Sequence, residues 1–380
     1  MSGAIIHEWI EATGGAEKVV DSFVEMLPTL PLLCLWNDAP NRFPAVDVKE
    51  SILARTPLRK SKAAALPLMP AVWRSWKNDN VEWALISSHL FAHHLRFRGR
   101  GEIDRFIYVH TPARYLWTPE LDARGASPLV RMAAPALRSL DRRRAQEGGN
   151  FAANSNFVAR RIEDFWGVEA TTIYPPVDVD RIKESREVEQ AWTAAEKDIL
   201  KSLPSEFLFC ASRMVPYKRM DAAITAGSLS NTPVVIAGDG PDRARLEHIA
   251  EAANVPVIFV GRVSDEMLYR LYQRCSAFIF VGVEDFGIVP VEAMAAGAPV
   301  VGNRIGGVAE TVVDGETGAL CNPDDPADFQ DAVERAVNCS SVVTRSRAEL
   351  FSAENFKENI KSWVGEDRIN SANRVDSRAA

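Results

Sequence analysis

The C-terminal half of the sequence alternates short apolar runs with segments of helical periodicity, and this alternation limits the possible folds more than any other feature. Five runs are almost wholly apolar and rich in β-branched or aromatic residues: 206–212, 232–238, 255–261, 276–282 and 298–303. Such strands are typical of parallel sheets, because helices cover both faces of a parallel sheet. The segment from about 177 to 351 is therefore predicted to form a doubly wound α/β domain.

The N-terminal half shows the same pattern less clearly. Residues 3–9 are predicted to be a strand and 14–28 a helix, and further strands are predicted at 83–89, 105–111, 149–155 and 170–176. These segments indicate a second α/β domain over residues 1–176. The pair Pro175 and Pro176 marks the linker, since residues before proline favour extended backbone, and we expect a cleft between the domains beside it.

The last segment, 352–380, is predicted to contain a C-terminal helix that could return to the N-terminal domain, followed by a polar tail. Beyond Val364 the sequence has one Ile and one Val among polar residues and small breakers. A segment so poor in apolar residues buries too little surface to offset the entropy of ordering it. The tail is therefore predicted to be disordered.

The composition excludes several classes of protein. With 380 residues, 47% hydrophobic and 25% charged, the chain is long enough for two folded domains and is neither disordered nor fibrous. The five cysteines form no CxxC pair, which argues against a zinc knuckle or a disulfide scaffold and favours the cytoplasm. No apolar stretch approaches the ~18 residues that span a bilayer. The net charge of −7 and the lack of a recognised binding motif argue against nucleic acid as a partner.

The sharpest group of candidate site residues lies in EDFGIVPVEAMAAG, where Glu284 and Glu292 flank a strand-to-helix junction. Gly287 between them allows a ligand to approach the backbone, and the following helix directs N–H groups and a positive dipole end toward an anion. Two glutamates eight residues apart are usually a loop carboxylate and a surface helix residue. Here they follow the fourth strand of a parallel sheet, where such folds bind ligands, and a phosphate-ester site is favoured.

Two cations follow the first strand of the same domain. Arg213 and Lys218 lie in SRMVPYKRMD, on a loop at the same sheet edge, where they can neutralise a diphosphate. The alternative is a solvated basic loop. Arg262 and Val263 follow the third strand, where a nucleobase could lie against the backbone, although a plain strand-to-helix turn explains them equally well.

The N-terminal half offers fewer candidates. Gly14 and Gly15 precede a helix and could bring a phosphate to its N–H groups, or they could form only a turn. His110 ends a strand in YVHTPARYLW, where it could bond a sugar hydroxyl or share a proton, although a lone histidine is more often structural. His89 and His93 have zinc-ligand spacing with His94 adjacent, but no third ligand is apparent and we expect no metal.

Taken together, these segments resemble the retaining glycosyltransferases of family 4, which have the GT-B architecture of two facing Rossmann-like domains. The resemblance covers nearly the whole chain, from HEWIEATGGAEKV through HTPARYLW, ANSNFVARRI, SRMVPYKR and FVGRVSDEMLYRLY to EDFGIVPVEAMAAGAPVVGNRIGG. Within the family, HTPARYLW is most similar to members that transfer mannose from GDP-mannose in bacterial surface polysaccharide synthesis.

The resemblance implies specific roles for the candidate residues. Arg213 and Lys218 would hold the donor diphosphate, with Gly15 approaching it from the other domain. His110 would touch the transferred sugar. The remaining donor contacts would be Glu284 to the sugar hydroxyls, with the backbone of Phe286, Gly287 and Ile288 nearby, Glu292 to the ribose and Val263 beside the nucleobase.

The predicted reaction needs no cofactor. Fixed cations can stabilise the negative charge that develops on the leaving diphosphate, and the C-terminal domain has no DxD motif at a strand end, so metal independence is expected. No carboxylate is an evident nucleophile, and front-side attack is favoured from the family. The acceptor would be a lipid-linked or other glycan. The alternatives are a UDP-sugar-dependent transferase, a nucleotide-sugar 2-epimerase of the same fold, and a partner subunit with a decayed site.

The segment 58–77 combines basic residues with Leu66, Met69, Trp73 and Trp76. Basic side chains beside aromatic ones suit the interface of an anionic membrane, so peripheral contact with the inner face of the plasma membrane is one interpretation. A partly buried helix with a solvated basic face is the other. Pro67 interrupts any long helix here.

Overall fold

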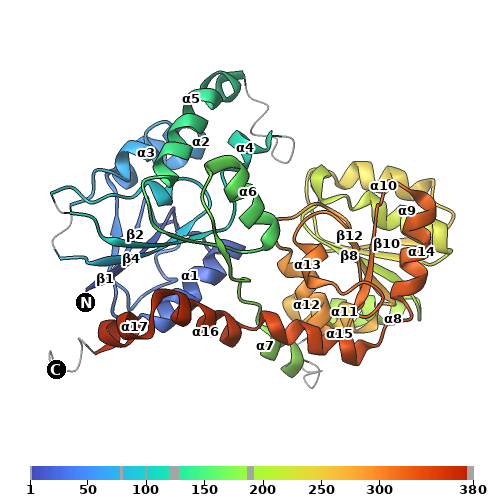
Figure 1. Cartoon of the computed structure of the whole chain (residues 1–380). Coiled ribbons are helices and arrows are strands. Elements are labelled where there is room, and N and C mark those ends of the chain that lie inside the picture. Colours follow the sequence, from blue (N-terminus) through green and yellow to red (C-terminus); the bar gives the residue numbers. More distant parts are fainter. Residues whose placement is uncertain (1, 78–79, 100, 120–127, 186–191, 375–380) are drawn as a thin grey trace. The chain divides into compact units, whose positions relative to one another are not determined.

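The computed structural model describes residues 2–374 apart from 78–79, 100, 120–127 and 186–191. The chain divides into two compact units: unit 1 is Met1–Pro176 with Glu354–Ala380, and unit 2 is Val177–Ala353. Each unit contains one parallel sheet with helices packed against it (Figure 1). The prediction of two doubly wound α/β domains is confirmed.

The unit 1 sheet has seven strands in the order β3-β2-β1-β4-β5-β6-β7. The strands are β1 (Gly3–His7), β2 (Leu32–Cys34), β3 (Val48–Glu50), β4 (Trp83–Ser88), β5 (Asp104–Val109), β6 (Asn150–Ala153) and β7 (Thr171–Thr172). The sequence predicted all of these except β2 and β3. The strand order reverses between β1 and β4, whose register pairs His7 with Ser87. Ligands of open α/β sheets bind at the carboxyl ends of the strands at such a reversal.

Two groups of helices bury the two faces of this sheet. They are α1 (Gly15–Met26), α2 (Lys62–Ala65), α3 (Met69–Val72), α4 (Arg114–Trp117), α5 (Pro128–Ala145), α6 (Asn156–Trp166), α16 (Ala353–Val364) and α17 (Glu366–Asn373), with short 3₁₀ turns at Ile52–Arg55, Pro57–Lys60 and Ala92–His94. One core contains Trp73 and Trp166 and the other contains Phe23 and Tyr108. The helices α16 and α1 pack against each other: the rings of Phe356 on α16 and Phe23 on α1 are 5.9 Å apart (Figure 1).

The predicted disorder beyond Val364 is wrong as far as Asn373. Residues of α17 bury Ile369 and Ala372 in the same core as α1. Thr29 donates to the Ala372 carbonyl at 3.1 Å, and the Asn373 side chain donates to the Met26 carbonyl at 3.0 Å. Two apolar side chains are enough to hold this helix in place because they pack against a core that the rest of unit 1 forms. Residues 375–380 lie outside the described residues.

The unit 2 sheet has six strands in the order β10-β9-β8-β11-β12-β13. The strands are β8 (Leu208–Ala211), β9 (Val234–Ala237), β10 (Val257–Gly261), β11 (Ala277–Phe280), β12 (Val300–Asn303) and β13 (Gly318–Cys321). The sequence predicted the first five and missed β13. The strand order reverses between β8 and β11, so the loops that follow these two strands meet at one edge of the sheet.

Helices surround this second sheet. They are α7 (Val179–Glu184), α8 (Ala194–Ser202), α9 (Asp221–Ser230), α10 (Arg243–Glu251), α11 (Asp265–Arg274), α12 (Ile288–Ala296), α13 (Val308–Thr311), α14 (Pro326–Ala336) and α15 (Ser341–Ala348), with 3₁₀ turns η7 (Pro216–Lys218) and η8 (Glu349–Phe351). α11 begins at a capping serine, because the Ser264 hydroxyl accepts from the Met267 N–H at 3.2 Å. α12 begins after Gly287, whose φ of 91° suits glycine.

Candidate functional site

The reversal point of the unit 2 sheet brings Lys218 and Glu284 together. Lys218 ends the turn η7 after β8, and Glu284 follows β11. A Cβ added at Gly282 would lie 3.1 Å from the carbonyl oxygens of Tyr217 and Lys218, so glycine lets the turn press against the end of β11. The Lys218 ammonium contacts the Glu284 carboxylate, and the two side chains are 14% and 15% exposed. Two residues that the sequence placed in one site are thus in direct contact.

This ion pair keeps the Lys218 ammonium at the carboxyl edge of the sheet. Lys218 Nζ also lies 5.8 Å from the centre of the Phe280 ring, so its surroundings are partly apolar. Arg213 is exposed on the same loop and its guanidinium donates to the Tyr217 hydroxyl at 3.2 Å. An anion that reached this edge could therefore bind both cations, one of which would exchange part of its contact with Glu284 for the anion.

The loop after Glu284 is held by two glycines that follow β12. Gly307 donates its N–H to the Glu284 carbonyl at 2.9 Å, and a Cβ added at Gly307 would lie 2.3 Å from the Phe286 Cα. A Cβ added at Gly306 would lie 2.9 Å from the Glu284 carbonyl oxygen. Phe286 is buried and its ring lies 5.6 Å from that of Phe351. The role of this glycine pair was not predicted, although its place after a predicted strand was a usable signal.

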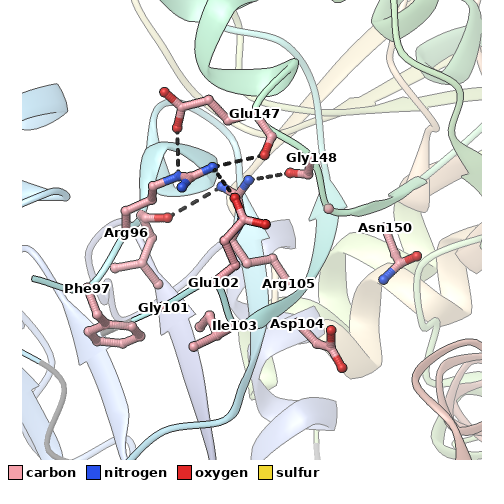
Figure 2. A pocket seen from close by; sticks show the side chains of 12 residues that line it. Arg96, Phe97, Gly101, Glu102, Ile103, Asp104, Arg105, Glu147, Gly148 and Asn150 are labelled. Carbon is pink, nitrogen blue, oxygen red and sulfur yellow. Dashed lines mark hydrogen bonds and ion pairs between the residues drawn. The ribbon is translucent and has the colours of Figure 1, made fainter. Parts of the chain in front are cut away.

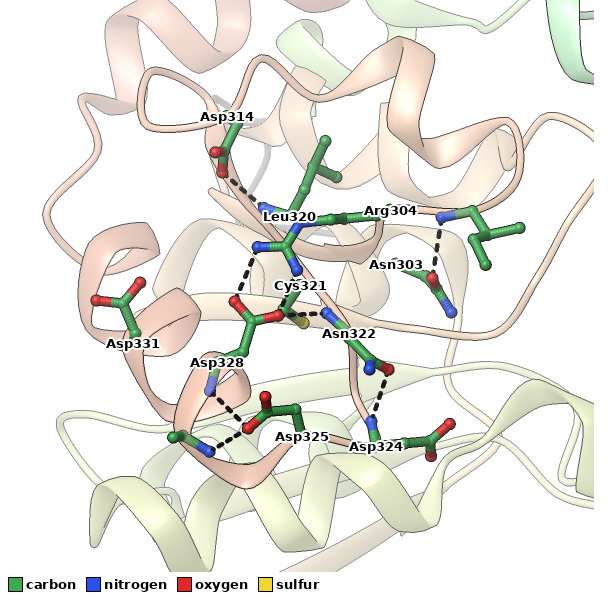
Figure 3. A network of polar contacts seen from close by, with 12 residues as sticks. Asn303, Arg304, Asp314, Leu320, Cys321, Asn322, Asp324, Asp325, Asp328 and Asp331 are labelled. Carbon is green, nitrogen blue, oxygen red and sulfur yellow. Dashed lines mark hydrogen bonds and ion pairs between the residues drawn. The ribbon is translucent and has the colours of Figure 1, made fainter.

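A polar network lies at the carboxyl end of β12, where it contacts the start of the loop that carries Glu284 (Figure 3). Asn303 donates its side-chain amide to the Val281 carbonyl at 3.0 Å and accepts from the Ile305 N–H at 2.9 Å. Arg304 donates to Asp328 at 2.8 Å, and Asp328 also accepts from the Asn322 N–H at 2.7 Å. The hydrogen bond from Arg304, together with the one from the Asn322 backbone, lowers the pKa of Asp328 to about 2. The loop that carries Glu284 is therefore held at its start by Asn303 and farther along by Gly307.

A cavity of about 430 Å³ lies in unit 2 beside the loop that carries Arg213. Its lining includes Arg213, Gly238, Val263 and Val289. Gly238 has a φ of 121°, and a Cβ there would lie 1.9 Å from the Ser212 carbonyl oxygen, so the loop after β9 approaches the loop after β8 closely. Glu292 lies one helical turn beyond Val289 on α12, and its charge, after burial, raises the pKa of the Tyr272 hydroxyl. The predicted base and ribose residues are therefore close in space.

The reversal point of the unit 1 sheet carries His110 in a line of hydrogen-bonding side chains. His110 follows β5 and is half-buried, with Nε2 2.8 Å from Ser87 Oγ. Ser87 Oγ is also 3.0 Å from Nδ1 of the buried His7. Neither neighbour of His110 was predicted from the sequence. They end adjacent parallel strands, but 80 residues separate them, and nothing in the local pattern distinguishes them.

Gly15 begins α1, and the residues around it leave little room. Gly14 precedes the helix, and a Cβ there would lie 2.0 Å from Glu17 Oε2, so the Glu17 carboxylate folds back over Gly14. Glu17 is buried in the first turn of the helix, where its negative charge interacts favourably with the helix dipole. Gly15 itself is exposed.

Glu8 anchors the loop that follows β4. It is fully buried, and its carboxylate accepts from the N–H groups of Leu90 at 2.9 Å and Ala92 at 2.7 Å. Burial raises the pKa of Glu8 against the influence of these bonds. Glu8 also lies near His7 and His89, and these three side chains could surround a cation. The hydrogen bonds from the backbone already explain why a carboxylate is buried at this position.

The absence of a third ligand beside the adjacent histidines was a wrong inference. Asp141 on α5 brings Oδ1 within 2.9 Å of His94 Nε2 and 3.1 Å of His93 Nε2. Its second oxygen accepts from the indoles of Trp117 at 2.7 Å and Trp166 at 2.8 Å. The sequence could not show this, because 47 residues separate Asp141 from His94. Three N–H groups, those of His94, Trp117 and Trp166, donate to the buried carboxylate, so hydrogen bonds compensate its burial.

The segment 58–77 packs mainly into unit 1. Met69 and Trp73 are fully buried in its core, although Leu68 remains 48% exposed. The basic side chains form ion pairs, such as Lys62 with Glu11 at 2.8 Å and Arg74 with Glu147 at 2.7 Å. The structure thus favours the partly buried helix over a membrane-facing one. No helix of the described residues is long and apolar enough to cross a membrane.

A larger cavity of about 500 Å³ lies at the amino ends of β5 and β6 (Figure 2). Arg96 pairs there with Glu147 at 2.9 Å and Glu102 at 3.2 Å, and the buried Arg105 donates to the His93 carbonyl at 3.1 Å. Burial lowers the pKa of Arg105 to about 10. The charged side chains described here pair with groups of unit 1 itself. The cavity lies at the sheet edge opposite to the one where such folds bind ligands.

Comparison with known proteins agrees with this architecture. Two family profiles match the chain: "Glycosyltransferase Family 4" over residues 13–181 and "Glycosyl transferases group 1" over residues 193–363. Two Rossmann-like units of this kind define the GT-B class. The chain belongs to the family 4 glycosyltransferases, as the sequence motifs predicted.

Solved structures show the same fold. The Anabaena protein HepE in complex with UDP aligns with a TM-score of 0.69 at 16% identity, covering 96% of this chain and 99% of that one. Sucrose-phosphate synthase from Thermosynechococcus elongatus aligns with a TM-score of 0.69 at 17% identity, covering 95% and 98%. At this level of identity the likeness concerns the fold alone.

Curated relatives match part of the chain. A D-inositol 3-phosphate glycosyltransferase of Nocardioides is 29% identical over 58% of this chain and 54% of the relative. The serotype-specific mannosyltransferase WbdA of Escherichia coli is 33% identical over 40% and 20%. A GDP-mannose-dependent phosphatidylinositol monomannoside mannosyltransferase of Mycolicibacterium smegmatis is 29% identical over 53% and 56%. The matches span about a fifth to just over half of these relatives, and mannosyltransferases are among them.

Proposed function

We propose that this protein is a retaining, metal-independent hexosyltransferase that moves mannose from GDP-mannose to a lipid-linked or other glycan acceptor. The observation that carries the proposal is the contact between Lys218 and Glu284 at the reversal point of the unit 2 sheet. It places a partly desolvated cation next to a carboxylate that can accept hydrogen bonds from sugar hydroxyls. A nucleotide sugar needs both, one for its diphosphate and one for its hexose.

In the proposed reaction the bond from the anomeric carbon to the phosphate oxygen breaks, and negative charge develops on the diphosphate. Arg213 and Lys218 stabilise that charge, which supplies most of the catalysis without a cofactor. The departing phosphate oxygen takes the proton of the acceptor hydroxyl, which attacks from the same face, so the configuration is retained. The loop that carries Glu284 packs closely against Gly306 and Gly307, and this contact would position its carboxylate for the sugar hydroxyls.

The other candidate residues complete the donor site. Val263 and the 430 Å³ cavity would receive the base, and Glu292 on α12 would bond the ribose. The backbone of Phe286, Gly287 and Ile288, at the start of α12, would lie along the hexose, since helix N-termini favour anions and hydroxyl oxygens. From unit 1, Gly15 would approach the diphosphate and His110 would touch the transferred sugar.

The choice of donor rests on the names of relatives. Two of them are mannosyltransferases, and one of these is described as GDP-mannose-dependent. A UDP-sugar donor is the second candidate, because the HepE structure contains UDP. A cytoplasmic location is part of the proposal and is supported by the five unpaired cysteines, all of which the structure describes.

The experiment is a thermal-shift series with GDP, UDP and ADP, followed by transfer assays with the sugar nucleotide of the stabilising base. A nucleotide at about 100 times its Kd adds about 2.7 kcal/mol to the stability of the native state. GDP should raise Tm in the wild type and in Lys201→Ala, a control at an 80% exposed lysine of unit 2, and should fail to do so in Lys218→Ala.

Each outcome separates the candidates. Stabilisation by UDP and not by GDP would replace the mannose donor with a UDP-sugar. Conversion of the donor sugar without any acceptor, observed by NMR, would make the protein a 2-epimerase. Full turnover in Lys218→Ala and Arg213→Ala would contradict the proposed role of the cations.

A further inference from the structure

The cavity at the amino ends of β5 and β6 is lined by a buried cation that lacks a counter-ion. The cavity has a volume of about 500 Å³, and Arg105 on β5 lines it (Figure 2). Arg105 is only 6% exposed and forms no ion pair with any carboxylate of the described residues. A charge withdrawn from water and left without a counter-ion is costly, so a nearby anion would bind favourably.

The guanidinium of Arg105 has donors to spare. Nη1 donates to the carbonyls of His93 at 3.1 Å and Leu95 at 3.4 Å, and Nη2 donates to the Gly148 carbonyl. A guanidinium has five N–H groups. The Nε–H and the second Nη2–H of Arg105 therefore have no partner among the described residues. These two N–H groups lie along one edge of the planar guanidinium, which can bind two oxygens of a phosphate or carboxylate.

The charges around Arg105 do not balance. Glu147 shares its carboxylate among three arginines, which are Arg74, Arg96 and Arg144 (Figure 2). Arg96 also pairs with Glu102, whose side chain is 81% exposed. Among the described residues, four arginines of this cluster thus share two carboxylates. Asp104, which also lines the cavity, pairs separately with Arg368 on α17.

Arg105 remains charged in these surroundings. Burial lowers its pKa to about 10, and the positive charges of Arg96 and Arg74 act in the same direction. A group with this pKa is still protonated at neutral pH. An anion in the cavity would relieve the repulsion between these arginines and would use the free edge of Arg105.

The size of the cavity and the excess of charge indicate the class of ligand. Gly101 and Gly148 line the cavity, and a Cβ added at either would meet no atom within 4 Å. Small-molecule sites have volumes of about 300 to 1,000 Å³, so there is room for more than a single ion. A phosphate group carries about 1.5 to 2 negative charges near neutral pH, which matches two unpaired arginines better than a single carboxylate does.

We propose that this cavity is an anion-binding site in which the Nε and Nη2 N–H groups of Arg105 hold the phosphate group of a small phosphorylated molecule. Arg96, on the same cavity wall, adds a second positive charge. Free phosphate presents the same chemistry, and the experiment distinguishes the two sources. The site lies within unit 1 and does not depend on the identity of the proposed sugar donor.

The test is a thermal titration of the full chain with inorganic phosphate and with glycerol 3-phosphate, and potassium chloride at equal ionic strength is the reference. Both phosphates should raise Tm beyond the chloride reference, because a ligand bound only by the native state stabilises it. Tighter binding of glycerol 3-phosphate identifies an ester as the ligand. Equal affinity for the two identifies free phosphate.

Two variants remove the donors. Arg105→Met replaces the guanidinium with an apolar side chain and should abolish the phosphate-dependent rise in Tm. Arg105→Lys keeps the charge without the planar edge, and the Kd for phosphate should increase at least tenfold, that is by about 1.4 kcal/mol. The matched control is Lys49→Met, at a lysine of unit 1 that is 55% exposed and pairs with Asp47, and it should keep the wild-type response.

The cations of unit 2 could also bind phosphate, so the titrations are repeated in Lys218→Ala, where the rise should persist. A rise no larger than that in chloride, or an undiminished rise in Arg105→Met and Arg105→Lys, would overturn the inference. A response lost in Lys218→Ala and kept in the Arg105 variants would place the anion in unit 2 and overturn it equally. If Arg105→Met fails to fold, Arg105→Lys still decides the question.

Discussion

Replacing His94 by glutamine should change how the stability of unit 1 depends on pH. Burial and the charge of His93 lower the pKa of His94 from 6.5 to about 4, although the Asp141 carboxylate acts in the opposite direction. As the pH falls from 6.5 to 4, the unfolded chain binds a proton at His94 and the folded chain does not. The free energy of unfolding therefore decreases over this window and is independent of this group above it.

The size of the effect follows from the two pKa values. One pKa unit corresponds to about 1.4 kcal/mol, so the wild type should lose about 2 kcal/mol through this group between pH 7 and pH 4.5. The glutamine side chain in His94→Gln would retain an N–H donor toward Asp141 but does not titrate. Burial would raise the pKa of Asp141, but the two histidines lower it well below its ordinary value, so its own contribution is lost only in stronger acid.

Urea unfolding followed by tryptophan fluorescence measures this, because eight of the nine tryptophans lie in unit 1 and two of them bond Asp141. The wild type minus His94→Gln difference in unfolding free energy should fall by about 2 kcal/mol between pH 7 and pH 4.5. Parallel curves for the two proteins over that range would show that His94 is not held neutral by burial, and the reasoning about this cluster would fail.

Three further predictions concern other parts of the chain. Glu284→Gln should bind GDP about fivefold more tightly in calorimetry, because the diphosphate no longer competes with a carboxylate for Lys218, while transfer falls at least tenfold; weaker GDP binding would contradict this. Gly307→Ala should lower the stability of unit 2 by about 2 kcal/mol in calorimetric melting, since its Cβ would meet the Phe286 backbone at 2.3 Å; a melting curve like that of Gly101→Ala, which has open space, would refute it. Ile369→Ala should cost unit 1 about 2 to 3 kcal/mol in urea and the exposed Asn370→Ala under about 0.5; equal effects would mean that α17 does not pack.

The sequence predicted the strands whose environment leaves a local trace. β8, β9, β11 and β12 are buried along their whole lengths, and all their residues except Asn303 are apolar or glycine. β3 has the sequence VKE and is an edge strand with two exposed residues, so no apolar run marks it. β2 has only three residues, too few for a period to show. The strands that the sequence did not predict, β2, β3 and β13, are thus short or lie at a sheet edge.

The same distinction applies to the candidate site. Glycine and charge patterns at strand ends indicated the Lys218 and Glu284 loops, because such loops have a sequence signature wherever they occur. The hydrogen-bonded neighbours of His110 and the carboxylate of Asp141 have none. A serine in a strand or an aspartate in a helix is ordinary, and its task appears only when the tertiary contacts are known.

Topology explains why the paired residues are so far apart in the sequence. In both sheets the strand order reverses between two neighbouring parallel strands, β1 and β4 in unit 1 and β8 and β11 in unit 2. Parallel neighbours at a reversal are connected by all the strands and helices that lie between them in the chain. The residues that follow them therefore meet in space although they are distant in sequence. His7 and Ser87 are 80 residues apart, and Lys218 and Glu284 are 66 apart. Helices diverge to opposite faces at the same point and leave the carboxyl edge open. Each unit thus presents polar side chains where its fold leaves access, and a change of strand order in either sheet would separate the pair of that unit.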